Sequence, residues 1–327
     1  MNSKAKIIKF TELSIKIVIL LLGIWILYKK LFCDKNITQL FIDIKSSVVS
    51  KNNILLILFA LLLFPLNIYL EGIKWKIQLK PIENINIWKS FLSIFTGITS
   101  GMFFPNRIGN FLGRIFMLER GNRIKAAMVT IVGGMGQMIV TVSLGLVAAV
   151  FFVKKYLVLS IIAVVLIITL LLIMYFNIHF LKYFQFLIPK KFKGKTKEYF
   201  EIFSLYSKKE LLKILTISFL KYFIYTFQFV LLIWAFNIPL TYFKAMIPVS
   251  LTYILMMIIP FITITEIAVR GPVSILVFEK WFIINNISSS YGILVFSASS
   301  LLWILNIAIP SVIGLFLIHR LKFFRKK

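Results

Sequence analysis

Apolar stretches long enough to cross a lipid bilayer recur along this chain of 327 residues. A helix that spans the hydrocarbon core needs about 20 mainly apolar residues. Lipid offers the backbone no hydrogen-bond partners, so runs of this length fold as helices. We therefore predict an all-α fold, a polytopic integral membrane bundle. The expected spans are Phe10–Tyr28, Ile54–Leu70, Ala126–Val153, Tyr156–Phe176, Ile214–Phe236, Ala245–Thr263 and Tyr291–Ile318.

Composition supports a membrane protein with a single domain. Hydrophobic residues make up 60% of the chain and charged residues 15%, whereas soluble domains are nearer half apolar and a quarter charged. The longest polar stretch, Asn177 to Lys213, is too short for an independent domain, so residues 1–327 are expected to form one transmembrane domain. The first apolar stretch lacks a small-residue cleavage site and reads as a retained helix.

The arginines are distributed unevenly. The chain has seven arginines and 31 lysines, and four of the arginines lie between Pro105 and Arg123, here called the first polar island. A fifth, Arg270, lies in a second polar island, Ile264–Gly271, within another apolar region. Guanidinium groups bind phosphate or carboxylate through two parallel hydrogen bonds, which an ammonium group cannot do. The two islands are therefore candidates for an anion-binding site.

Two shorter segments decide the topology, Trp88–Phe104 and Pro272–Ile284. Cytoplasmic loops of membrane proteins are enriched in Lys and Arg. This bias is satisfied if the Trp88 segment enters and returns as a re-entrant hairpin while the Pro272 segment crosses. The result is about eight transmembrane helices, with both termini, both islands and the Asn177–Lys213 loop in the cytoplasm.

The predicted hairpin has two structural consequences. Backbone that is not a continuous helix is tolerated at membrane depth only beside protein or a water-filled cavity, so we expect a polar cavity. Ser93, Gly97 and Gly101 are spaced by four, which forms a small-residue face that lets helices approach closely.

The first island reads as a helix that begins near Pro105. Arg107, Asn110 and Arg114 then share one face, because their spacings are three and four. Glu119 and Arg123 are also four apart and are expected to pair. The alternative is an amphipathic helix whose arginines sit at the membrane surface.

The second island places Glu266 four residues before Arg270, as an intrahelical ion pair requires. Pro260, Gly271 and Pro272 bracket the pair and predict a broken helix, a feature that lines binding sites in many transporters. Charges inside a membrane segment are costly and indicate function. The alternative is a pair that only closes a helix end. We predict that Arg107, Arg114, Glu266 and Arg270 converge on one cavity.

The motifs resemble a known family. The pattern P-N-R-I-G-x-x-x-G-R, followed by E-x-G-N-R-x-K-A and later by T-E-x-x-V-R-G, is similar to the flippase-like membrane domain of the lysylphosphatidylglycerol synthase family. That domain is the membrane half of the multiple peptide resistance factors, which move an aminoacylated phospholipid between leaflets. This chain has Asn110 where the family pattern has Glu. The resemblance marks the following residues: Arg107, Gly109, Arg114, Glu119, Arg123, Glu266 and Arg270. Headgroup binding is expected of these arginines and glutamates, and of Asn110 because it shares a helix face with Arg107 and Arg114.

These observations predict a lipid translocase of the bacterial inner (cytoplasmic) membrane. Its expected cargo is a phospholipid or a polyprenyl phosphate lipid, and a separate lipid-modifying enzyme or a second copy of the chain are candidate partners. No catalytic residue, metal ligand or cofactor is predicted, and the net charge of +27 is attributed to membrane-flanking loops, not to nucleic-acid binding. The alternatives are a membrane-embedded glycosyl or headgroup transferase and a non-catalytic envelope assembly subunit.

Overall fold

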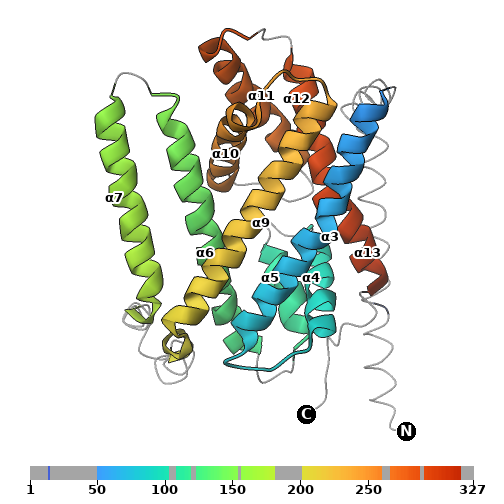
Figure 1. The fold of residues 1–327 in the computed structure, drawn as a ribbon. Coiled ribbons are helices and arrows are strands. Elements are labelled where there is room, and N and C mark those ends of the chain that lie inside the picture. Colours follow the sequence, from blue (N-terminus) through green and yellow to red (C-terminus); the bar gives the residue numbers. More distant parts are fainter. Residues whose placement is uncertain are drawn as a thin grey trace, which may run out of the picture.

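A computed structural model describes residue 14 and residues 50–102, 108–118, 123–153, 156–180, 201–259, 266–287 and 291–317. Every regular element in these ranges is a helix, as predicted (Figure 1). Five units in them are long and apolar enough to cross a membrane: α3 (Lys51–Leu79), α6 (Arg123–Val150), α7 (Leu157–Phe176), α9 (Lys208–Ala235) and the continuous stretch Gly292–Leu317. The expected first span, Phe10–Tyr28, lies outside the described residues.

Helix α3 is longer than its apolar run. The run predicts an end at Leu70, but the helix continues to Leu79 through Glu71 and Lys74. Its last turns are covered by protein, since Trp75 and Leu79 are fully buried. Glu71 and Lys74 therefore lie inside the bundle, which corrects the predicted end of the helix.

Helices α4 (Ile87–Gly101) and α5 (Ile108–Phe116) form the first hairpin, the α4–α5 hairpin. Asn86 caps α4, because its side-chain oxygen accepts a hydrogen bond from the Lys89 backbone N–H at 2.7 Å. The 15 residues of α4 rise by only about 22 Å, less than the roughly 30 Å of a hydrocarbon core. Helix α4 is thus short and packs against α5, as the re-entrant prediction requires, and its course relative to the membrane stays a prediction.

Glycines hold the α4–α5 hairpin closed, as the small-residue face predicts. A Cβ atom added to Gly97 would lie 2.7 Å from the Asn110 carbonyl oxygen, and one added to Gly113 would lie 2.4 Å from the Thr96 carbonyl oxygen. Gly101 is equally close to the Asn110 side chain. The two backbones approach to a distance that leaves no room for a side chain at these positions.

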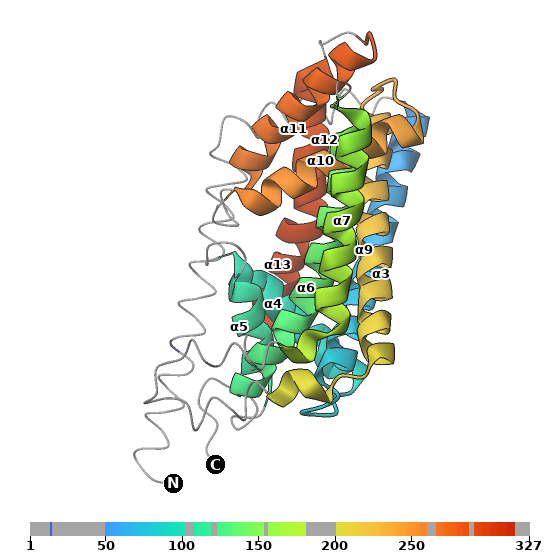
Figure 2. The same ribbon diagram turned by 90° about the vertical axis from the view of Figure 1, so that its left-hand side faces the viewer.

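Helices α10 (Tyr242–Ile258) and α11 (Glu266–Ile284) form a second hairpin. Figure 2 shows α10 and α11 in the upper half of the molecule and α4 and α5 in the lower half. The predicted helix break at Gly271 and Pro272 is wrong, because α11 runs through both residues. Gly271 fits directly against the Phe296 ring of α12, and this packing favours an uninterrupted helix. Helix α10 ends at Ile258, and Pro260 lies outside the described residues.

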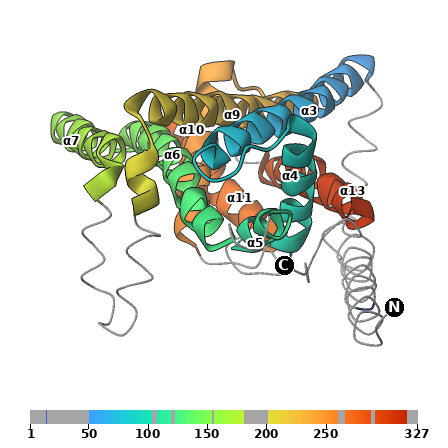
Figure 3. The same ribbon diagram turned by 90° about the horizontal axis from the view of Figure 1, so that it is seen from below.

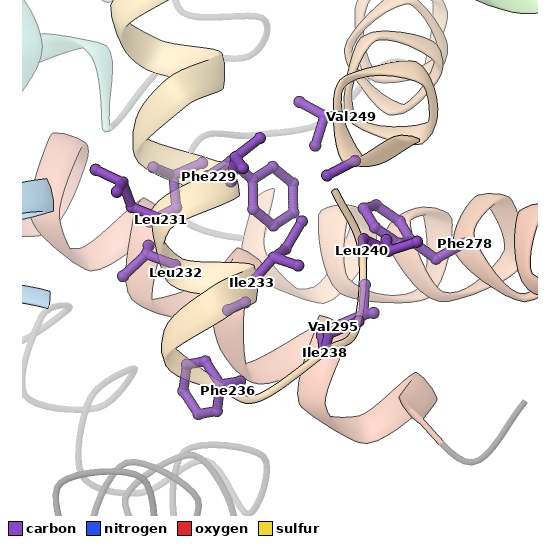
Figure 4. Packing of buried hydrophobic residues seen from close by; sticks show 14 of the residues in the cluster. Phe229, Leu231, Leu232, Ile233, Phe236, Ile238, Leu240, Val249, Phe278 and Val295 are labelled. Atoms are coloured by element: carbon purple, nitrogen blue, oxygen red, sulfur yellow. The ribbon is translucent and has the colours of Figure 1, made fainter. Parts of the chain in front are cut away.

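An apolar core anchors the second hairpin to the rest of the bundle. Phe229 and Ile233 of α9, Val249 of α10 and Phe278 of α11 belong to one buried cluster (Figure 4). Val295 adds α12 (Gly292–Trp303) to the same cluster. The α10–α11 hairpin is thus fixed by side-chain packing in α10 and in the second half of α11.

The last membrane unit connects the two halves. Helix α12 passes through a π-helical turn, Ile304–Ala308, into α13 (Ile309–Leu317). Helix α13 then packs on α4, where the Thr99 hydroxyl donates to the Ser311 carbonyl oxygen at 3.0 Å. Seen along the long axis, α7 lies at the edge of the molecule and α11 near its middle (Figure 3).

Candidate functional site

The first island places two of its predicted residues on one face of α5. Asn110 and Arg114 both point at α4, where they lie against Gly101 and Gly97 respectively. The predicted shared face is therefore confirmed for these two residues. Arg107 and Glu119 lie outside the described residues.

Arg114 meets a carboxylate that the sequence did not single out. Its Nη1 donates to Glu71 Oε1 of α3 at 2.6 Å, and both side chains are 10% exposed. The guanidinium carbon of Arg114 also lies 5.7 Å from the centre of the Trp75 ring. A charged hydrogen bond in this buried setting fixes the end of α5 against α3.

Glu71 also forms ion pairs with two lysines. Lys74 Nζ lies 3.0 Å from Glu71 Oε2, and Lys221 Nζ of α9 also donates to Glu71 Oε2. Lys74 Nζ reaches Gln137 Oε1 of α6 at 3.5 Å as well. Glu71, Lys74, Arg114 and Lys221 are here called the Glu71 cluster, which joins α3, α5 and α9.

The Glu71 cluster lies deep in the bundle. Lys221 is near the middle of the 28 residues of α9, a helix about 41 Å long at 1.5 Å per residue. Lys74 is 4% exposed and Glu71 is 8% exposed, so both lie on the buried side of α3. Buried ions are stable only when other charges, water or a ligand meet them.

The second island forms the predicted ion pair. Arg270 Nη2 donates to Glu266 Oε1 within α11, and Glu266 is fully buried. Arg270 Nη1 also donates to the Tyr225 hydroxyl of α9 at 2.9 Å, and its guanidinium carbon lies 5.9 Å from the Tyr253 ring centre. Glu266 and Arg270 are thus enclosed by protein beside α9, and the cytoplasmic placement of this island stays a prediction.

Helix α9 brings the two islands together. Lys221 contacts the Glu71 cluster, and Tyr225 contacts Arg270. These residues are four apart and therefore one turn apart, about 6 Å along the axis. Arg114 is therefore linked to α9 through Glu71, and Arg270 contacts the next turn of α9, although 156 residues separate the two arginines in sequence. Headgroup binding by these residues stays a prediction.

Arg123 is the remaining predicted residue that the structure describes. It is the first residue of α6, and its guanidinium carbon lies 5.0 Å from the centre of the Phe116 ring at the end of α5. Its predicted partner, Glu119, lies outside the described residues. Arg123 therefore belongs to the packing between α5 and α6.

Sequence reasoning missed Glu71, Lys74 and Lys221. Lys221 stood inside a predicted span, where an ionisable residue is itself a signal of function. Glu71 and Lys74 follow the apolar run, which was expected to end at Leu70. Their spacing of three, which suits a helical ion pair, was the available signal.

A family model described as the lysylphosphatidylglycerol synthase TM region matches residues 13–278. The chain belongs to this family. The matched range contains both islands of this family member and all four residues of the Glu71 cluster. Comparison with curated proteins and with solved structures finds no match to this chain.

The family match ends within α11. In this member of the family, α12 and α13 follow the matched range and complete the bundle. Thr99 of α4 bonds Ser311 of α13, and Gly271 of α11 fits against Phe296 of α12. Both hairpins of the family region therefore depend on contacts with this C-terminal unit.

Proposed function

We propose that this protein is a lipid translocase that moves a phosphate-containing headgroup across the bacterial inner membrane. The observation that carries the proposal is the Glu71 cluster, in which three cations meet one carboxylate at the middle of α9. A buried excess of positive charge is stabilised by an anion. The lipid phosphate is the anion that a membrane supplies in quantity.

The chemistry of Arg114 suits a phosphate. One of its nitrogens is bonded to Glu71, while its Nε is buried and has no hydrogen-bond partner among the described residues. A guanidinium group with unused donors can hold phosphate oxygens in a defined geometry. Arg270 provides a second guanidinium group. It is bonded to Tyr225, which lies one turn of α9 beyond Lys221 of the Glu71 cluster.

The two hairpins explain how a headgroup could cross while its acyl chains stay in lipid. The α4–α5 hairpin carries Arg114, the α10–α11 hairpin carries Arg270, and they occupy opposite halves of the molecule (Figure 2). In many transporters, helices that do not span the membrane continuously form sites near the midplane, and we propose the same role for these hairpins. The sequence contains no G-x-x-x-x-G-K-[ST] nucleotide-binding motif, so we propose downhill movement or coupling to a separate lipid-modifying enzyme.

Reconstitution tests this function. Purified protein in vesicles with a fluorescent phosphatidylglycerol in both leaflets should expose the inner-leaflet lipid to an impermeant reductant. Vesicles with an unrelated membrane protein of similar size provide the control. A rate equal to that control, for every phosphate-containing lipid tested, would contradict the proposal.

Arg114→Lys is the most direct variant. It keeps the charge that balances Glu71 but removes the planar, two-pronged geometry. We expect a transport rate lower by about 10-fold, corresponding to one lost charged hydrogen bond of roughly 1.4 kcal/mol. Elution as a single folded species in size-exclusion chromatography is expected to be unchanged. A variant with the wild-type rate would show that the guanidinium is only structural.

A further inference from the structure

We infer that the lipid moved by this site has a doubly negative headgroup without an ammonium group, as in a phosphomonoester or a diphosphate. The inference rests on the proposed function, since it names the class of lipid that the same site accepts. Three features of the described residues support it: an excess of positive charge, buried donors without a hydrogen-bond partner, and carboxylates that are already in ion pairs.

The charge balance of the Glu71 cluster is the first argument. The cluster has three cations, Lys74, Arg114 and Lys221, and one carboxylate. It therefore carries two positive charges in excess. A phosphodiester headgroup supplies one negative charge, whereas a phosphomonoester supplies nearly two at neutral pH. Only the second class balances the described charges.

Unpaired donors beside the cluster are the second argument. Arg114 Nε and Trp75 Nε1 are buried and have no hydrogen-bond partner among the described residues. The guanidinium carbon of Arg114 lies 5.7 Å from the Trp75 ring centre, so the two donors belong to one location. Buried donors of this kind are costly unless a ligand satisfies them. The terminal oxygens of a phosphomonoester offer more acceptors than the two free oxygens of a phosphodiester.

The state of the carboxylates is the third argument. Among the described residues, the buried carboxylates are Glu71 and Glu266. Glu71 is shared by three cations, and Glu266 is paired with Arg270. An aminoacylated or ethanolamine headgroup would bring an ammonium group to a region where each of these acids already has a cationic partner. Repulsion by the excess positive charge disfavours such a headgroup.

The test compares three fluorescent lipids with identical tails in vesicles that contain the wild-type protein. The lipids are phosphatidic acid, phosphatidylglycerol and phosphatidylethanolamine, and the readout is the rate of movement above that of protein-free vesicles. We expect phosphatidic acid to move fastest and phosphatidylethanolamine slowest. The advantage of phosphatidic acid over phosphatidylglycerol should shrink when the pH is lowered from about 7.5 to about 5, because the second phosphate pKa is about 6.

A variant with one charge fewer tests whether the Glu71 cluster causes the preference for phosphatidic acid. Lys74→Gln removes one of the excess charges and should lower the ratio of the phosphatidic acid rate to the phosphatidylglycerol rate by about tenfold. Lys76→Gln is the matched control, since Lys76 lies on the same helix, is exposed and contributes to no contact of the cluster. The control should keep the wild-type ratio.

The outcomes separate the two proposals. If none of the three lipids moves faster than in protein-free vesicles, the translocase function itself is contradicted. If lipids move but phosphatidylethanolamine moves as fast as phosphatidic acid, the charge-class inference is overturned while translocation stands. An unchanged ratio in folded Lys74→Gln would also overturn it, and the wild-type pH dependence decides the matter if that variant does not fold.

Discussion

Glu71 is the residue on which the buried charges depend. Its substitution by Gln would leave Lys74, Arg114 and Lys221 facing one another without a carboxylate. Removing one partner from a buried ion pair costs about 3–5 kcal/mol, so we expect a clear fall in the thermal unfolding midpoint in detergent. Glu201→Gln, at an exposed carboxylate, is the control and should change stability by less than about 0.5 kcal/mol. Equal midpoints for both variants would contradict a central role for Glu71.

Glu266 has the same role for Arg270. The acid is fully buried and Arg270 is 4% exposed. Glu266→Gln would therefore leave a buried guanidinium without its carboxylate, in contact with the Tyr225 hydroxyl and the Tyr253 ring. We expect this variant to lose more transport and more stability than Arg114→Lys, by roughly 2 kcal/mol. Thermal unfolding and the vesicle assay, applied to both variants side by side, measure the difference. The reverse order would indicate that the Glu266–Arg270 pair is dispensable.

At the scale of elements, the α4–α5 hairpin depends on glycine. A methyl group at Gly97 would lie 2.7 Å from a backbone oxygen of α5, which cannot move without displacing Arg114. Gly97→Ala should therefore destabilise the protein by about 1–3 kcal/mol and slow transport. Gly134→Ala is the matched control, because a Cβ there meets nothing within 4 Å. Since Ala is the better helix former, the control should be neutral or more stable by up to about 1 kcal/mol.

At the scale of the whole molecule, the charge distribution predicts the orientation in the membrane. The end of α7 and the start of α9, which flank the lysine-rich loop, lie at one end of the bundle, and the start of α10 lies at the other (Figure 1). We expect cysteines at Lys193 and Lys326 in a Cys33→Ser background to resist an impermeant thiol reagent in intact cells. Lys244→Cys, at an exposed position in the first turn of α10, should react. Labelling at Lys193 from outside would reverse the orientation.

The sequence by itself determined the class of fold and the shortness of the Trp88–Phe104 helix. Long apolar runs can only be helices in lipid, and the apolar run after Trp88 ends early at a polar island. The spacing of Glu266 and Arg270 determined their ion pair, because an interaction between residues four apart depends on local helix geometry alone.

Only the tertiary structure decided which charges meet. Glu71 pairs with both Arg114 and Lys221 because the assembled bundle brings α5 and α9 to α3, and no local rule links positions so far apart in sequence. The same packing carries α3 past its apolar run and keeps α11 helical through Pro272. In each case, contacts with other helices supply the free energy that the local sequence lacks, so the candidate site becomes visible only when the bundle is assembled.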